Sequence, residues 1–217
     1  MKNLKFIIIL SIISATAFAE TWTDNFSGQV LGAQWKGDRD NFSLSDGSLQ
    51  GRNAHPILLL PLRFVEVGEN LKDYNVECQI NVVTPNLLEC TKGAIILRHK
   101  GNDGYVFALH IATKTIEVYR LSDGEMLLSK EEPLELEKWY KMKAELDGEN
   151  MSFYLDEKLV GKIKDDRSLS GPVGLAVQDA LNVLFDDFSI TGDRIDIDPS
   201  LIKFKCKLST TWSRIKI

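Results

Sequence analysis

The amino-acid sequence predicts an all-β protein, built as a sandwich or barrel of antiparallel strands. Three observations carry this prediction. Apolar and polar residues alternate with period two in several segments, which is typical of half-buried strands. Turn signals made of Gly, Asn, Asp and Pro recur about every 8–12 residues, the spacing of short antiparallel strands. No window shows a convincing helical period.

The expected strands follow one another along the chain. Asp73 to Val83 (DYNVECQINVV) is the clearest case, because apolar residues occupy every second position. Gly101 to Gly104 (GNDG) is strong turn chemistry, since these residues tolerate positive φ. The other strands that the pattern predicts are 93–99, 105–111, 116–121, 139–146, 151–155, 159–163, 173–177 and 183–190.

The N-terminus has the parts of a secretory signal peptide. Phe6 to Ile13 is an apolar run behind a lysine-bearing start, and Ala17 and Ala19 fit the small-x-small rule for cleavage. The run is shorter than the ~20 residues that a membrane-spanning helix needs. We therefore predict that residues 1–19 are removed and that the mature protein is periplasmic or extracellular. An uncleaved N-terminal anchor is the alternative.

Length and charge indicate one globular domain without a nucleic-acid partner. The chain has 217 residues, which is enough to form one hydrophobic core. Its net charge of −5 gives no indication of the basic surface that nucleic-acid binding needs. Residues 20–193 form the predicted domain, and no segment of it is apolar enough to span a membrane. In residues 194–217, lysines alternate with apolar residues. This segment is expected to be an edge strand or tail, with attachment to an anionic surface as the alternative.

The cysteines allow one disulfide. Cys78 and Cys90 flank the turn at Thr84 to Leu87 almost symmetrically, so in an antiparallel hairpin they would lie opposite each other. Export permits such a bond, and two buried free thiols are the alternative. The chain has no CxxC spacing and no Cys/His cluster, so no zinc site is expected.

Short motifs along the predicted domain carry a resemblance to a known family. They are Trp22-Thr23-Asp24-Asn25-Phe26, Leu31 to Trp35, Phe42 to Leu49, Gly93 to Arg98, Trp139 to Lys143, Phe153 to Asp156, Gly174 to Ala176 and Phe185 to Phe188. Together they resemble the concanavalin A-like (laminin G-like) jelly-roll modules of secreted bacterial proteins, which include carbohydrate-binding and 3-keto-disaccharide hydrolase-like domains. The resemblance covers about Trp22 to Asp193. It implies a two-sheet antiparallel jelly-roll β-sandwich, and its motifs indicate fold more than activity.

Lys143 to Met151 (KAELDGENM) contains the E-x-D-x-E pattern that retaining glucanases on this fold use for catalysis. That chemistry needs its carboxylates on one face of a continuous strand. Asp147-Gly148 is a turn dipeptide, and the apolar alternation stops before it and resumes after it. The stretch is therefore predicted to be a hairpin turn that points Glu149 to solvent, out of line with Glu145.

The hairpins around the strands 105–111 and 116–121 fix a register and two faces. The residues expected on the core face are Ile96, Phe107, Leu109, Ile111, Ile116 and Val118. Those expected on the opposite face are Val106, Ala108, His110, Glu117 and Tyr119. Trp22, Trp35 and Trp139 are expected to be core or staple aromatics rather than binding platforms.

The ligand site is predicted on that opposite face. His110 is expected across from Glu117 and beside Tyr119, with Gln79 added if its strand joins the same sheet. A sugar site needs an aromatic platform and planar hydrogen-bonding groups, which these residues supply. An ordinary solvated face is the alternative.

Two further residues are candidates at the end of the same hairpin. Arg98 and Tyr105 are predicted to pair there. Either Arg98 packs on the Tyr105 ring, or both contact a ligand from the rim.

The resemblance also implies a structural calcium ion. Modules of this type often hold one between the first and last strands. Asp24 and the pair Asp186-Asp187 stand at those places, and hard cations need clustered oxygen ligands. The alternative is that they are ordinary polar residues at strand ends.

The function that these observations favour is an exported, non-catalytic β-sandwich module that binds an extracellular glycan or another cell-surface ligand. A glycoside hydrolase-like enzyme on the same fold is the first alternative, and a structural or adhesive envelope protein is the second. No Ser-His-Asp set, phosphate loop or metal-hydrolase motif rises above chance. The chain also lacks the Asn-Ser-Gly strand motif expected of the hydrolase-like branch.

Overall fold

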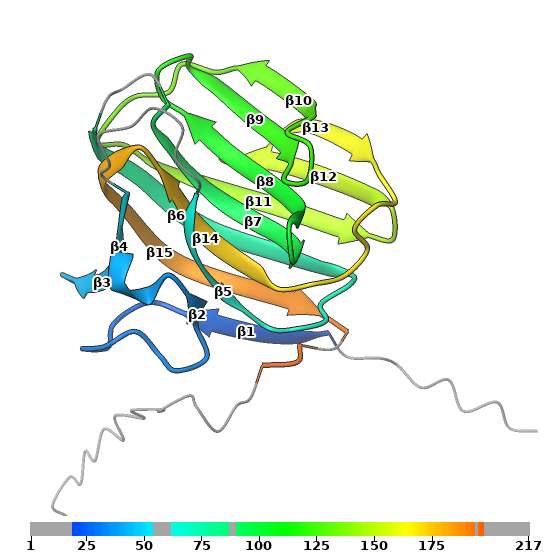
Figure 1. Cartoon of the computed structure of the whole chain (residues 1–217), viewed down its shortest axis with the longest axis horizontal. Helices are drawn as coiled ribbons and strands as arrows, with labels where there is room; N and C mark the ends of the chain where they lie inside the picture. The colour runs from blue at the N-terminus through cyan, green and yellow to red at the C-terminus, as the bar shows by residue number, and fades with distance from the viewer. Residues whose placement is uncertain (1–18, 54–61, 87–89, 194, 198–217) are drawn as a thin grey trace, which may run out of the picture.

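The computed structural model describes residues 19–53, 62–86, 90–193 and 195–197, which form two antiparallel sheets packed face to face (Figure 1). The eight-stranded sheet has the order β13-β12-β11-β6-β15-β4-β3, and β1 also pairs with β15. The seven-stranded sheet has the order β10-β9-β8-β7-β14-β5-β2. The predicted all-β sandwich is therefore confirmed.

Each of the nine strands that the alternation predicts is present, with its ends within three residues of the predicted bounds. The strands of the eight-stranded sheet are β1 Glu20–Asp24, β3 Phe42–Ser45, β4 Ser48–Asn53, β6 Tyr74–Pro85, β11 Trp139–Asp147, β12 Asn150–Leu155, β13 Lys158–Lys164 and β15 Ala180–Gly192. Those of the seven-stranded sheet are β2 Lys36–Gly37, β5 Arg63–Val67, β7 Lys92–Lys100, β8 Asp103–His110, β9 Thr115–Arg120, β10 Met126–Glu131 and β14 Val173–Gln178. A short 3-10 helix, η1, spans Arg39–Asn41.

The short strands β1 to β5 and the edge strand β10 are not predicted by the sequence pattern. Most of these strands are brief, and β10 buries none of its side chains fully, so its alternation is weak. Their pairing with neighbouring strands, rather than their own pattern, makes them strands.

The core lies between the sheets and is filled by every second residue of the central strands. Trp22 and Trp35 are buried, as predicted, and both pack edge-on against Phe188, with ring centroids 6.0 and 5.1 Å away. The expectation for Trp139 is wrong, since 40% of it is exposed. It faces outward because the next residue, Tyr140, faces the core.

The seven-stranded sheet is apolar on both faces. Phe107, Leu109, Ile116 and Val118 line the core, as predicted. Ile96 does not, because it lies opposite Val106 and shares the outer face with it. The predicted register of β7 is therefore wrong by one residue. The reason is a bulge at the β7–β8 hairpin, which follows Leu97 and includes Arg98 at a φ of +50°.

The connection from β6 to β7 crosses from one sheet to the other instead of forming a hairpin. The predicted disulfide is therefore wrong, and Cys78 and Cys90 are free thiols. Cys78 is buried and its Sγ donates to the backbone oxygens of Gln79 and Asp186 at 3.3 and 3.4 Å. Burial raises the pKa of this thiol.

The acidic stretch is a hairpin turn, as predicted. Asp147 pairs with Asn150, and Gly148 between them has a φ of +53°. Glu145 binds Lys143 Nζ at 2.9 Å, whereas Glu149 binds Lys164 Nζ at 2.8 Å beyond the turn. These carboxylates therefore do not line one continuous strand.

The described strands run from Glu20 to Gly192. Residues 1–18, 194 and 198–217 lie outside the described residues, so the signal peptide, the domain limits and the lysine-rich segment stay predictions. The described part of the chain contains no helix with the length and apolar character that a bilayer crossing requires.

Candidate functional site

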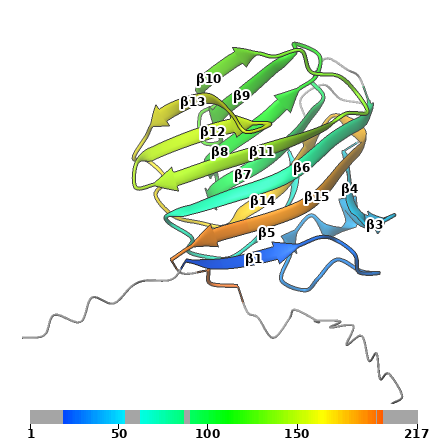
Figure 2. The same ribbon diagram turned by 180° about the vertical axis from the view of Figure 1, so that it is seen from behind.

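Figure 2 shows the eight-stranded sheet from the side opposite to Figure 1. Polar side chains form a ladder across the outer face of this sheet, which we call the polar face. One row joins Asp186 of β15, Gln79 of β6 and Lys141 of β11. The next row joins Ser189, Glu77 and Lys143 on the same three strands. Residues directly opposite in an antiparallel pair share a face, so these donors and acceptors stand side by side.

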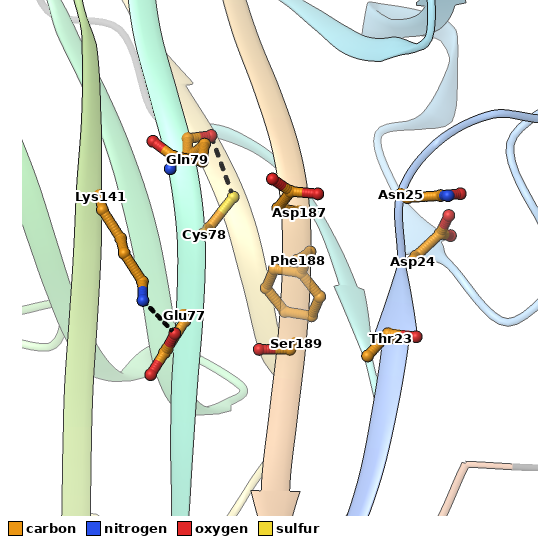
Figure 3. Close-up of a pocket in the computed structure, with 10 residues that line it drawn as sticks. All are labelled: Thr23, Asp24, Asn25, Glu77, Cys78, Gln79, Lys141, Asp187, Phe188 and Ser189. Carbon is orange, nitrogen blue, oxygen red and sulfur yellow. Dashed lines mark hydrogen bonds and ion pairs between the residues drawn. The ribbon is translucent and has the colours of Figure 1, made fainter.

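A bulge in β15 opens a hollow in the polar face (Figure 3). The register of β15 shifts between Asp186 and Ser189, and Asp187 adopts a φ of +48°. The same strand pairs with β4 before the bulge and with β1 after it. The hollow has a volume of about 440 Å³. Its polar lining residues are Thr23, Asp24, Asn25, Glu77, Gln79, Lys141, Asp187 and Ser189.

Ion pairs hold the charged groups at the centre of the polar face. Lys141 Nζ lies 2.8 Å from Glu77 Oε2 and 2.7 Å from Glu157 Oε1. Hydrogen bonds to Glu157 and then to Glu77 raise the pKa of Lys141. Lys141 therefore stays charged at neutral pH, and its ammonium group holds the Glu77 side chain in place.

Asp186 differs from the carboxylates around it. Its pKa is raised, first by burial and then by the negative charge of Asp187. Its neighbour across the pair, Gln79, carries no charge to oppose this shift. The shifted pKa values of the other carboxyl groups on this face, those of Glu145 and Glu157, are lowered. Of these three groups, Asp186 therefore takes up a proton most readily.

The predicted calcium ligands come together only in part. Asp24 and Asp187 line the same hollow. The two oxygens of Asp24 already accept bonds from the Phe26 backbone N–H at 2.9 Å and Trp35 Nε1–H at 2.8 Å. Within residues 19–53, 62–86, 90–193 and 195–197, no three His, Cys, Asp or Glu side chains form a metal-binding group. Calcium stays a prediction, which thermal unfolding with added calcium and with a chelator would test.

Comparisons with known proteins identify the architecture. Neither a family model nor a curated protein sequence matches the chain. The carbohydrate binding module CBM66 from Bacillus subtilis matches with a TM-score of 0.64 and 20% identity, over 73% of this chain and 96% of that module. A lichenase (β-1,3-1,4-glucanase) from a mouse hindgut metagenome matches with a TM-score of 0.58 and 11% identity, over 81% of this chain and 99% of the enzyme. The fold is a concanavalin A-like jelly roll.

A xylan β-1,4-xylosidase from Bacillus halodurans C-125 contains a similar jelly roll. The TM-score is 0.62 and the identity 20%, over 77% of this chain. The chain spans only 38% of that xylosidase. At these identities the likeness concerns the jelly roll itself, and the site has to be argued from the residues of this chain.

On the other sheet of the jelly roll, three of the predicted site residues form a cluster that is only partly exposed to solvent. His110 lies opposite Thr115 rather than Glu117, yet its Nδ1 is 2.7 Å from Glu117 Oε1. Lys92, which the sequence analysis missed, binds Glu117 Oε2 at 2.8 Å and lies over the Tyr119 ring. The three predicted residues are thus together, but Glu117 is only 7% exposed and its oxygens bind protein groups.

The other predicted ligand residues lie elsewhere in the jelly roll. Gln79 is on β6 in the opposite sheet, so it joins the polar face instead of His110. Arg98 and Tyr105 are fully buried, and Tyr105 Oη donates to Asp165 Oδ1 at 2.7 Å. Neither can contact a ligand from the rim, so that hypothesis is wrong.

The sequence predicts a core or staple position for Trp139 and a calcium-binding role for Asp187, and it predicts no site for Lys141 or Ser189. Period two would have found Trp139 and Lys141, since both alternate with buried residues of β11. Asp187 and Ser189 carry no comparable signal, because the bulge in β15 decides which way they point.

Proposed function

We propose that the mature protein is an exported, non-catalytic module that binds a carbohydrate on the polar face. The observation that carries this proposal is the hollow beside β15, where amide, hydroxyl and carboxylate groups from different strands converge. Sugar recognition needs such planar and hydroxylic partners at fixed positions. Carbohydrate-binding and carbohydrate-cleaving proteins among the structural neighbours support the same ligand class.

The charges of the hollow favour a neutral sugar. Asp24, Glu77 and Asp187 line it, against the single cationic group of Lys141 among its described lining residues. A uronic acid or a sulfated sugar would bring more negative charge to this surface and be repelled. A neutral glycan chain, which offers only hydroxyl groups and C–H faces, fits this lining better.

The carboxylates of the polar face support binding rather than hydrolysis. A retaining glycosidase needs two carboxyl groups about 5–5.5 Å apart, one of them free to attack. Glu77 is held by Lys141, and Glu145 by Lys143 and the Tyr154 hydroxyl. Hydrogen bonds from Lys143 and Tyr154 lower the pKa of Glu145, so this group is a poor proton donor at neutral pH.

One observation favours the hydrolase as a second candidate. A general acid needs a raised pKa, and Asp186 on the polar face has one. If the protein cleaves glycosides, Asp186 is the residue that we expect to protonate the leaving oxygen.

Calorimetric titration with neutral oligosaccharides, preceded by a glycan-array screen, tests the proposal. Q79A and D187N should each weaken binding about tenfold, close to the free energy of one lost hydrogen bond. D46N is the matched control, because Asp46 is exposed and also has a positive φ of 50° but lies in the β3–β4 turn. Failure of the wild-type protein to bind any glycan would overturn the proposal.

Release of reducing ends from the same oligosaccharides separates the two functions. The binding module should release none. Cleavage that D186N abolishes would establish the hydrolase instead and contradict a purely binding role.

A further inference from the structure

We infer that Trp139 and Asn81 form an aromatic subsite next to the hollow, so that the ligand is an oligosaccharide lying along β11 and β6 rather than a single sugar. This inference rests on the proposed function. It adds a second contact region and a minimum length to the ligand.

Trp139 is the first residue of β11 and projects from the polar face, where 40% of it is exposed. Among the described residues, the other strongly exposed large hydrophobic side chains are aliphatic. β11 already buries Tyr140, Met142 and Ala144 on its core face. The exposed indole of Trp139 therefore adds no packing to the hydrophobic core. An accessible indole face is what packs against the C–H face of a pyranose ring.

Asn81 lies directly opposite Trp139 on β6, and Leu184 of β15 lies on its other side. It is only 6% exposed, and its Oδ1 has no hydrogen-bond partner among the described residues. Buried acceptors are nearly always paired, so an unpaired one indicates a missing partner. This oxygen has almost no exposed surface, so a hydroxyl of a sugar ring seated on Trp139 would supply the donor once the side chains around Asn81 move aside.

The subsite is continuous with the hollow. Lys141 and Gln79, which line the hollow, come two positions after Trp139 on β11 and two positions before Asn81 on β6. Two residues of strand span about 6.6–6.8 Å and return to the same face. A sugar on Trp139 and a sugar at the hollow are therefore neighbours along one strand direction, as in a linear chain.

The geometry also selects among sugars. An indole ring packs best on a pyranose whose hydroxyls are equatorial, because both faces of such a ring carry C–H groups. Together with the acidic lining of the hollow, this favours a neutral chain of glucose or xylose units.

The test is a titration of the mature protein with xylo-oligosaccharides and β-glucan oligosaccharides of one to six units. The affinity of the wild-type protein should rise with chain length. W139A should weaken binding of the longest chains about tenfold or more and leave binding of the monosaccharide within about twofold. W139F keeps an aromatic ring and should retain most of the affinity. L169A, which removes another strongly exposed apolar side chain, is the matched control.

N81A should produce the same length-dependent loss, with a thermal midpoint within a few degrees of the wild-type value as the check on folding. A change in tryptophan fluorescence on binding should occur in the wild-type protein and largely vanish in W139F.

The outcomes separate this inference from the proposed function. If W139A binds every oligosaccharide as the wild type does while Q79A weakens them all, the subsite is wrong and the binding role stands. Equal loss for the monosaccharide and the hexasaccharide in W139A would also contradict a separate subsite. If the wild-type protein binds none of the oligosaccharides, both the subsite and the proposed function fail.

Discussion

Arg98 shows how single buried residues hold the loops at one end of the sandwich. It is fully buried, and its guanidinium donates to the backbone carbonyls of Lys72 at 2.6 and 3.1 Å, Gly148 at 2.6 Å and Ser168 at 3.4 Å. A buried guanidinium is tolerated only when its donors are used, and here they join three loops that are distant in sequence.

We expect R98M to lower the free energy of unfolding by about 3–5 kcal/mol, because three carbonyl groups lose a buried charged donor. R98K should recover only part of the loss, since an ammonium group cannot reproduce the planar fork. Equilibrium denaturation measures both effects. K100M, at an exposed position of the same strand, should stay within about 0.5 kcal/mol of wild type, and an equally small effect of R98M would refute this role.

Glu117 gives a pH dependence at the residue scale. Burial alone would raise its pKa, but hydrogen bonds from His110 and Lys92 outweigh burial and lower the pKa from 4.5 to about 2. Because the pKa of Glu117 is lower in the folded than in the unfolded protein, its ionised form stabilises the fold, and this stabilisation is fully present above about pH 4.5, the unfolded value. This stabilisation is lost as the pH falls toward 2.

E117Q should therefore cost about 3 kcal/mol at pH 7 and flatten the loss of stability between about pH 5 and 2. Denaturation curves across that range check the prediction, with E131Q on the exposed end of β10 as the control. If the free energy of unfolding falls as steeply between pH 5 and 2 in E117Q as in the wild type, the prediction is wrong.

At the scale of elements, tight turns decide how neighbouring strands register. The β11–β12 hairpin has a two-residue turn in which Gly148, with a φ of +53°, comes before Glu149 at negative φ. A glycine at the first central position is typical of a type II′ turn, whose twist matches that of the strands. The turn therefore explains why the acidic stretch bends instead of continuing as a strand.

G148A should destabilise the protein by about 1 kcal/mol, because the Cβ of alanine makes a backbone conformation with positive φ unfavourable. Nothing lies within 4 Å of the added Cβ, so the cost is conformational. G28A is the matched control, since its φ is ordinary and its nearest neighbour is 3.5 Å from the added Cβ. A neutral G148A in urea denaturation would show that the turn tolerates a side chain.

At the scale of the whole molecule, the order of the strands separates residues that are close in sequence. β6 and β7 follow each other in the chain but lie in different sheets, which keeps Cys78 and Cys90 as free thiols. The same crossing places Gln79 on the polar face and His110 on the far sheet.

The thermal midpoint of a C206S variant should be the same with and without a reducing agent. This follows because no disulfide crosses the described part of the sandwich. Differential scanning calorimetry checks it. A midpoint that falls by several degrees in reductant would mean that Cys78 and Cys90 are bonded after all.

The sequence by itself determined the longer strands, the turns between them and the all-β class. Period two and turn chemistry are local, so they predicted which residues of β8 and β9 share a face and the turn at Gly148, although His110 lies opposite Thr115 rather than Glu117. Only the tertiary structure decided which strands share a sheet, which side chains line the hollow and that Arg98 is buried. The physical reason is that sheet order depends on pairing between strands far apart in the chain, and a bulge such as that at Asp187 leaves no mark in the local pattern.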